Sequence, residues 1–307
     1  MLAAFVPIWA LTVVGYVAGR TGVLGFGAVD VLGRFVFYVA MPAALLDTLT
    51  RRPITGLAGE GVAAFVGATL IVGAVGFGVA RWGFRRSLGE QTIAAMAAGY
   101  VNAGNLGIPV AVQVLGDASF IAVVLLIQTT ILTPVILGTL DLARQEHGTK
   151  GRWRRLATVP LRSPVMLACL AGVGLGAAGV ALPPLVAGVV ALLGDAAVPS
   201  ALVALGLSLV RTDGADQVPG RPVEVALSVL LKSCVQPVVC LLLARFVFGL
   251  HGAALFAAVL CSALPTAQNT FVFARAYGVD GRFPRDAVVA STAASMVTLT
   301  VTAALLG

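Results

Sequence analysis

A polar, glycine-rich stretch inside a hydrophobic segment decides the fold of this chain: Asn102-Ala103-Gly104-Asn105-Leu106-Gly107-Ile108-Pro109. Its asparagines, glycines and proline remove backbone hydrogen bonds and add polar amides to a segment that is otherwise apolar. A membrane tolerates such irregular backbone only where it is buried in protein or lines a cavity. The stretch therefore predicts an interrupted membrane helix and marks a candidate binding site.

A second polar stretch interrupts another apolar segment in the C-terminal half: Leu264-Pro265-Thr266-Ala267-Gln268-Asn269-Thr270. Paired interrupted helices in corresponding halves of a chain are typical of secondary transporters, in which the interruptions form the substrate site. The two stretches are therefore expected to act together.

The composition is that of an integral membrane protein. Hydrophobic residues make up 59% of the 307 residues, charged residues 11%, and the mean hydropathy is +1.01. The four cysteines stand singly in apolar segments, so we expect neither a metal site nor a cofactor. The net charge of +7 is dispersed over short loops, which argues against nucleic-acid binding and is typical of membrane topology.

The hydropathy pattern predicts an all-α membrane protein of about ten transmembrane helices. The polar connector 141–162 separates a first set of five spans, in residues 1–140, from a second set in residues 163–307. Because an odd number of spans reverses the direction of entry, the two sets are expected to be inverted repeats of a single transporter domain. Basic residues in alternate loops predict a multi-pass cell-membrane protein with both termini outside. The expected spans are 2–20, 29–49, 60–82, 91–113, 118–140, 163–181, 185–209, 223–247, 253–275 and 286–306.

Three motifs, in this order, resemble the auxin efflux carrier family. They are Asn-x-x-Asn-x-Gly-x-Pro at 102–109, the run beginning Leu-Gly-Asp-Ala-Ala at 193–209, and Leu-Pro-Thr-Ala-x-Asn at 264–269. The resemblance covers essentially the whole chain. It implies a five-plus-five inverted-repeat fold related to the bile acid and sodium symporters, with a scaffold, crossing fourth and ninth helices, and a homodimer. It also implies transport of organic anions such as malate, malonate or auxin-like acids, and the short central connector resembles the compact prokaryotic members.

The candidate substrate-binding residues lie in the two polar stretches. Side-chain amides can donate to a carboxylate, and the N-termini of half-helices add partial positive charge. The alternative is that the asparagines only cap the interrupted backbone. We assign substrate contact to Asn102, Asn105, Thr266, Gln268 and Asn269, and the helix interruptions themselves to Gly104, Gly107, Pro109 and Pro265.

Lys232 and Asp195 are candidates for charge or proton coupling. Lys232 lies deep in the eighth expected span, where a charged side chain usually has a partner or a cavity. Asp195, in the seventh span, is the nearest candidate partner by expected depth. The alternatives are a static ion pair, or an Asp195 that caps a helix near the interface.

The expected function is secondary or facilitative transport of small organic anions by alternating access. The chain lacks a phosphate-binding loop, so the driving force would be a gradient or the membrane potential. A sodium-coupled symporter and a membrane receptor without transport are the alternatives. We expect no enzyme, because the sequence offers no nucleophile with a base, no paired aspartates and no metal-binding helix.

Overall fold

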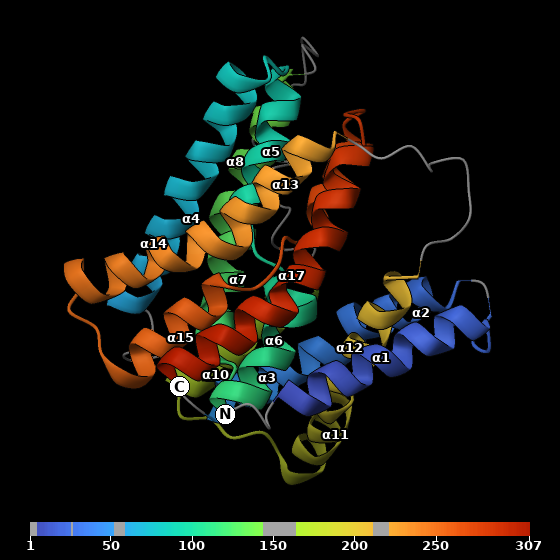
Figure 1. Cartoon of the computed structure of the whole chain (residues 1–307). Coiled ribbons are helices and arrows are strands. Elements are labelled where there is room, and N and C mark those ends of the chain that lie inside the picture. The colour runs from blue at the N-terminus through green and yellow to red at the C-terminus, as the bar shows by residue number, and fades with distance from the viewer. Residues whose placement is uncertain (1–4, 26, 52–58, 144–163, 211–220) are drawn as a thin grey trace. The chain divides into compact units, whose positions relative to one another are not determined.

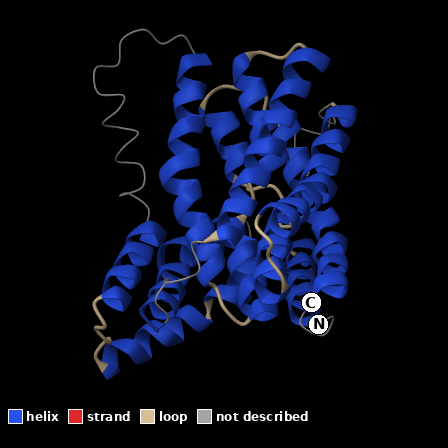
Figure 2. Cartoon of the chain, turned by 90° about the vertical axis from the view of Figure 1, so that its left-hand side faces the viewer, coloured by secondary structure: helices blue, strands red, loops and turns tan. Residues whose placement is uncertain are grey.

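The computed structural model describes residues 5–25, 27–51, 59–143, 164–210 and 221–307. These residues form helices joined by short loops, and no strand occurs among them (Figure 2). The predicted all-α membrane protein is confirmed. Most of the connector 141–162, with its cluster of basic residues, lies outside the described residues.

Six of the described helices are long and apolar enough to cross a membrane. They match six of the spans expected from hydropathy, within a few residues at each end: Ala28–Arg51, Glu60–Gly83, Ser119–Ala143, Pro184–Ser208, Pro222–Val247 and Arg282–Leu306. The remaining apolar helices are shorter: Phe5–Thr21, Ala103–Leu115, Pro164–Ala177 and Gly252–Ser262.

The chain folds into two compact units, each drawn from separate stretches of sequence. Unit 1 comprises Met1–Ala58, Ala103–Thr129 and Thr158–Thr212, and unit 2 comprises Gly59–Asn102, Thr130–Ala157 and Asp213–Gly307. Each unit therefore combines segments from the N-terminal and C-terminal halves of the chain.

Unit 1 is held together by close helix packing at small residues. Helix α1 packs against α12, where a Cβ atom on Gly206 would lie 2.0 Å from the carbonyl oxygen of Thr12. Glycine at this position lets the two backbones touch, as small residues do in membrane helix pairs. Its helices, labelled as in Figure 1, are α1 (Phe5–Thr21), α2 (Ala28–Phe35), η2 (Val36–Ala40), α3 (Met41–Arg51), η4 (Ala103–Gly107), α6 (Ile108–Val110), η5 (Ala111–Leu115), α7 (Ser119–Ile127), α10 (Pro164–Ala177), α11 (Pro184–Asp195) and α12 (Ala197–Ser208).

Unit 2 contains the first interrupted helix as far as Asn102 and the whole of the second interrupted helix. Within it α4 packs against α5, α14 and α15, and α13 packs against α17. Its helices are α4 (Glu60–Gly78), η3 (Val79–Gly83), α5 (Leu88–Gly99), α8 (Thr133–Ala143), α13 (Pro222–Leu230), η8 (Leu231–Val235), α14 (Gln236–Leu242), η9 (Leu243–Val247), α15 (Gly252–Ser262), α16 (Asn269–Ala276) and α17 (Arg282–Leu306). The π-helical turn η6 (Gln128–Leu132) precedes α8.

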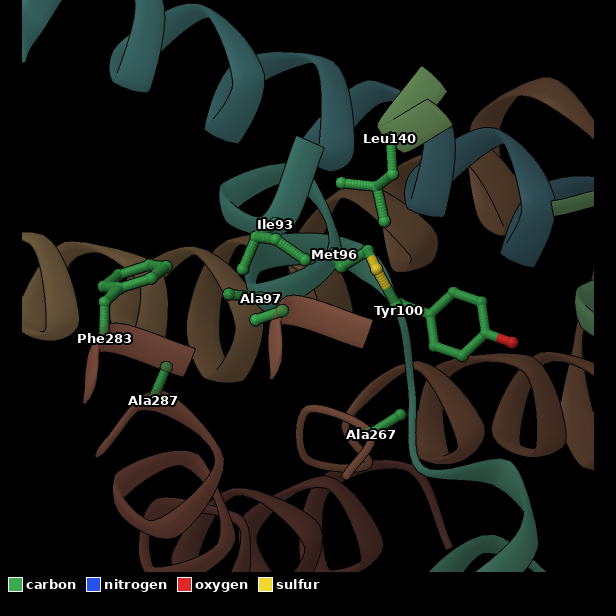
Figure 3. Packing of buried hydrophobic residues seen from close by; sticks show 9 residues of the cluster. Ile93, Met96, Ala97, Tyr100, Leu140, Ala267, Phe283 and Ala287 are labelled. Carbon is green, nitrogen blue, oxygen red and sulfur yellow. The ribbon is translucent and has the colours of Figure 1, made fainter. Parts of the chain in front are cut away.

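A buried hydrophobic cluster surrounds α5 in unit 2 (Figure 3). Ile93, Met96 and Ala97 of α5 pack with Phe283 of α17 and with Ala267, which lies in the second polar stretch. The core of unit 2 therefore packs directly around the two places where helices are interrupted.

The meeting point of the two interrupted helices

The first interruption is short: it covers residues 100–102 and ends at the first residue of the polar stretch that predicted it. Helix α5 ends at Gly99, and Tyr100 has extended backbone angles of φ −86° and ψ 109°. Helical structure resumes at Ala103 with the π-helical turn η4. The second interruption separates α15, which ends at Ser262, from α16, which begins at Asn269.

The two interruptions lie against each other as a pair of antiparallel extended segments. Val101 and Thr266 form an antiparallel bridge. The amide of Asn102 donates to the carbonyl oxygen of Pro265 at 2.8 Å, and the amide of Ala267 donates to the carbonyl oxygen of Tyr100 at 2.9 Å. Each interruption thus satisfies backbone groups that the other leaves without a helical partner, as a membrane interior requires.

Thr266 fastens this meeting point to the surrounding helices. Its hydroxyl donates to the carbonyl oxygen of Ala97 at 2.6 Å, and its amide donates to the Oγ of Ser291 at 3.1 Å. The side chain is buried. Because its hydroxyl is engaged with α5, Thr266 is a positioning residue in this conformation.

The start of α16 presents polar groups directly after the bridge. Gln268 occupies the N-cap position without a side-chain capping hydrogen bond and is half-buried, while Asn269, the first residue of the helix, is exposed. Thr270 is 0% exposed, and its hydroxyl has no hydrogen-bond partner among the described residues. A buried hydroxyl costs free energy unless something bonds to it. Sequence reasoning did not single out Thr270 as a contact, although it is the last residue of the second polar stretch.

Three of the residues expected to interrupt the first helix are themselves helical in the structure. Gly104 and Gly107 are part of η4, and Pro109 is in α6, so all three are helical and belong to unit 1. Pro109 lies at the start of α6, where a proline is tolerated because its missing amide hydrogen would have no partner within the helix. Pro265 does lie within its interruption.

The two asparagines of the first stretch fall in different units. Asn102 is buried and belongs to unit 2, where its backbone takes part in the bridge. Asn105 is half-buried in η4 of unit 1. The structure thus brings Asn102, Pro265 and Thr266 together and describes Asn105 in the other unit.

Lys232 is the most deeply buried charged group that the structure describes. It lies in the π-helical turn η8 and is 0% exposed. Its ammonium donates to the Oε1 of Gln236 at 2.6 Å and to the carbonyl oxygen of Ser262 at 2.9 Å. The predicted partner, Asp195, is exposed at the last residue of α11 in unit 1. Pairing of these two residues stays a prediction.

A cluster of ion pairs in unit 2 joins the region before α17 and the starts of α5 and α13. Arg86 pairs with Glu224, Arg221 pairs with Glu90 at 2.6 Å, and Asp280 pairs with Arg282 at 3.0 Å. The hydrogen bond with Glu224 raises the pKa of Arg86, and the hydrogen bond from Arg282 lowers the pKa of Asp280. Sequence reasoning missed this cluster because two of its pairs, Arg86 with Glu224 and Arg221 with Glu90, join residues that are far apart along the chain.

A large apolar groove of about 470 Å³ runs along α4, α5 and α8 and reaches Gly99 and Tyr100 at the first interruption. Its walls are mainly hydrophobic side chains such as Leu70, Phe77 and Ile136. A site for a carboxylate needs polar groups. The groove is therefore a less suitable place for an anion than the polar start of α16.

These features define the class of the protein. The described residues include apolar helices of membrane length and two helix interruptions whose backbones are paired with each other, and interrupted helices of this kind are typical of secondary transporters. The chain belongs to the membrane transport protein family, which it matches over residues 1–151 and 153–303. This is the family that the three sequence motifs indicated, and it is one of membrane transporters, not enzymes.

Relatives that align with nearly the whole chain support this assignment. A protein of Rhizobium meliloti named "Putative malonate transporter" is 26% identical over 302 residues, which cover 96% of this chain and 92% of the relative. An "Uncharacterized transporter" of Methanothermobacter thermautotrophicus is 26% identical and covers 95% of this chain and 94% of the relative. The "Uncharacterized transporter YfdV" of Escherichia coli is 27% identical over 306 residues, with coverage of 97% and 94%.

Proposed function

We propose that this chain carries small organic anions across the cell membrane by alternating access, with dicarboxylates such as malonate as the first candidates. The observation that carries the proposal is the hydrogen-bonded meeting of the two interruptions, followed directly by the start of a half-helix. The name of the Rhizobium meliloti relative supports the substrate class.

The chemistry of the meeting point suits a carboxylate. The N-terminus of α16 carries partial positive charge, and amides at helix N-termini bind anions readily. The side chains of Gln268 and Asn269 can donate from this end, and the buried Thr270 hydroxyl has no hydrogen-bond partner in the described part of the chain. We assign anion contact to these three residues together with Asn102, whereas contact by Asn105, which belongs to unit 1, stays a prediction from the sequence.

The rest of the proposal concerns architecture. Ten transmembrane helices would form two inverted five-helix repeats, residues 1–140 and 163–307, with both termini outside. One compact unit would move relative to the other during transport, and two chains would form a homodimer. The hydrogen-bonded pairing of an interruption from each half supports the inverted repeat, because symmetry-related segments are expected to meet at the axis.

Uptake of radiolabelled substrate into proteoliposomes tests the proposal. Uptake of malonate by the native protein is compared with uptake of a series of other acids that includes acetate and an indole carboxylate. An imposed membrane potential supplies the driving force, which is worth about 2.3 kcal/mol per charge per 100 mV. The double variant Asn102→Ala, Asn269→Ala should lose at least about tenfold of the flux, since each amide contributes a hydrogen bond to a charged ligand.

The matched control is Gln113→Ala, which removes an exposed side-chain amide in η5 and should leave flux unchanged. Equal flux in the native protein and the double variant would exclude the meeting point as the site. Binding of malonate without uptake would favour a receptor without transport.

A further inference from the structure

One lysine and one glutamine connect the C-terminal ends of both interrupted helices. The Lys232 ammonium donates to the carbonyl oxygen of Ser262, the last residue of α15. It also donates to Gln236, whose Nε2 donates in turn to the carbonyl oxygen of Gly99, the last residue of α5, at 3.0 Å. Gln236 is 0% exposed and also donates to the Thr69 hydroxyl at 3.1 Å.

These two carbonyls are where a cation is expected in a transporter with interrupted helices. The last carbonyls of a helix have no partner within it, and each helix C-terminus carries about half a negative charge. In known transporter folds, the C-terminal ends of half-helices and nearby unwound carbonyls coordinate the coupling Na⁺. Here the ends of α5 and α15 together amount to about one negative charge, which a single ammonium balances.

The partners of Lys232 also differ from those of an ordinary buried ion pair. A buried charge usually pairs with an opposite charge. In the described part of the chain, the Lys232 ammonium instead donates to a neutral amide and a backbone carbonyl. Its charge is thus directed at the helix ends.

We infer that Lys232 is a resident cation that takes the place of a coupling sodium ion where the two interrupted helices meet. The transport part of this inference rests on the proposed function and predicts that anion flux does not require sodium. The structural part does not rest on it: without the ammonium, the helix ends are left with uncompensated negative charge, and an external cation becomes stabilising.

The test compares Lys232→Met, which removes the charge at nearly constant length, with Arg245→Met. Arg245 is an exposed cation in the last turn of the same apolar span. This control removes an equal charge outside the hydrogen bonds that Lys232 and Gln236 make to Ser262 and Gly99. Each purified protein is studied in sodium chloride and in choline chloride, by thermal unfolding in detergent without substrate and by malonate uptake into proteoliposomes.

For the native protein, and likewise for Arg245→Met, the unfolding temperature and the malonate flux should each be the same in sodium chloride as in choline chloride. In choline chloride, Lys232→Met should unfold at a lower temperature than the native protein, and its malonate flux should be at least about tenfold lower, because hydrogen bonds to a charged group are lost. Sodium should raise the unfolding temperature of Lys232→Met alone.

Two results would overturn the inference: native flux that needs sodium, or an unfolding temperature of Lys232→Met that responds to sodium no more than that of the native protein. If Lys232→Met does not fold, Lys232→Gln, which keeps a polar donor without the charge, is read in the same way. Absence of anion flux in the native protein would count against the proposed function, whereas the unfolding measurements would still decide the role of Lys232.

Discussion

The amide of Asn102 donates a 2.8 Å hydrogen bond to the carbonyl oxygen of Pro265, and so ties together two segments that are far apart in the sequence. The reciprocal bond from Ala267 to Tyr100 makes the contact a two-bond antiparallel bridge. A bridge of this kind holds two helix interruptions in a fixed relation while leaving the half-helix that follows free to present its N-terminus to a ligand.

Ala267→Pro tests the bridge, because proline removes the amide hydrogen that Ala267 donates to Tyr100. Leaving the Tyr100 carbonyl without this partner should lower the free energy of unfolding by about 1–3 kcal/mol. Ala267→Ser keeps the amide and should stay close to the native protein. Thermal unfolding in detergent measures both, and equal stability of the two variants would show that the bridge contributes little.

Gly99→Ala should destabilise unit 2 where α4 and α5 touch. A Cβ atom on Gly99 would lie 2.8 Å from the carbonyl oxygen of Thr69 and 3.2 Å from the amide nitrogen of Gly73. Such overpacking against backbone costs about 1–3 kcal/mol. Gly73→Ala is the matched control, because its Cβ would meet the Ala95 carbonyl oxygen at 3.6 Å, an ordinary contact. A Gly99→Ala protein as stable as Gly73→Ala would contradict the close approach.

Thr266→Val and Thr270→Val should separate a positioning hydroxyl from a ligand-binding one. The Thr266 hydroxyl bonds to Ala97, so its loss should cost about 1 kcal/mol of stability with little change in the KM for malonate. The Thr270 hydroxyl has no partner among the described residues, so its loss should leave stability unchanged and raise KM about tenfold.

Unfolding temperatures of the two threonine variants measure the change in stability, and uptake kinetics measure the change in the KM for malonate. The assignment fails if Thr270→Val binds and transports malonate as the native protein does.

Asp280→Asn should show a pH-dependent loss of stability. The hydrogen bond from Arg282 holds the pKa of Asp280 below its ordinary value of 3.8. The stabilisation is therefore present in full well above that value and is lost as the pH falls through the lower pKa of the folded protein. The difference in unfolding temperature between the native protein and Asp280→Asn should be constant near neutral pH and shrink on acidification below 3.8. A difference that grows with acid would contradict the sign of this shift.

The sequence predicted six of the membrane-length helices to within a few residues, because length and hydropathy determine where a membrane helix can lie. The span expected at 223–247 corresponds to Pro222–Val247, and that at 118–140 to Ser119–Ala143. The position of the first interruption was predicted less well. The glycines and Pro109 were expected to break the helix, yet Gly104 and Gly107 lie in the π-helical turn η4, Pro109 lies in α6, and the non-helical residues are 100–102.

The polar partners could not be derived from the sequence. Lys232 was expected to have a partner or a cavity, with Asp195 as the candidate partner. Among the described residues, a glutamine four residues later and a backbone carbonyl receive its hydrogen bonds. Every residue has a backbone carbonyl, so the residue type does not reveal which carbonyl accepts a hydrogen bond. The pairing of Arg86 with Glu224 joins residues 138 positions apart. Such contacts follow from the tertiary fold alone.

The most direct test of the central claim is protection of an engineered cysteine by substrate. Asn269→Cys, in a background of Cys234→Ser that removes the exposed native thiol, should react with N-ethylmaleimide, since residue 269 is exposed. Gln113→Cys in the same background is the control. We predict that malonate at a concentration that saturates uptake slows labelling at position 269 and leaves labelling at position 113 unchanged. Equal labelling rates at position 269 with and without malonate would contradict a substrate site where the two interrupted helices meet.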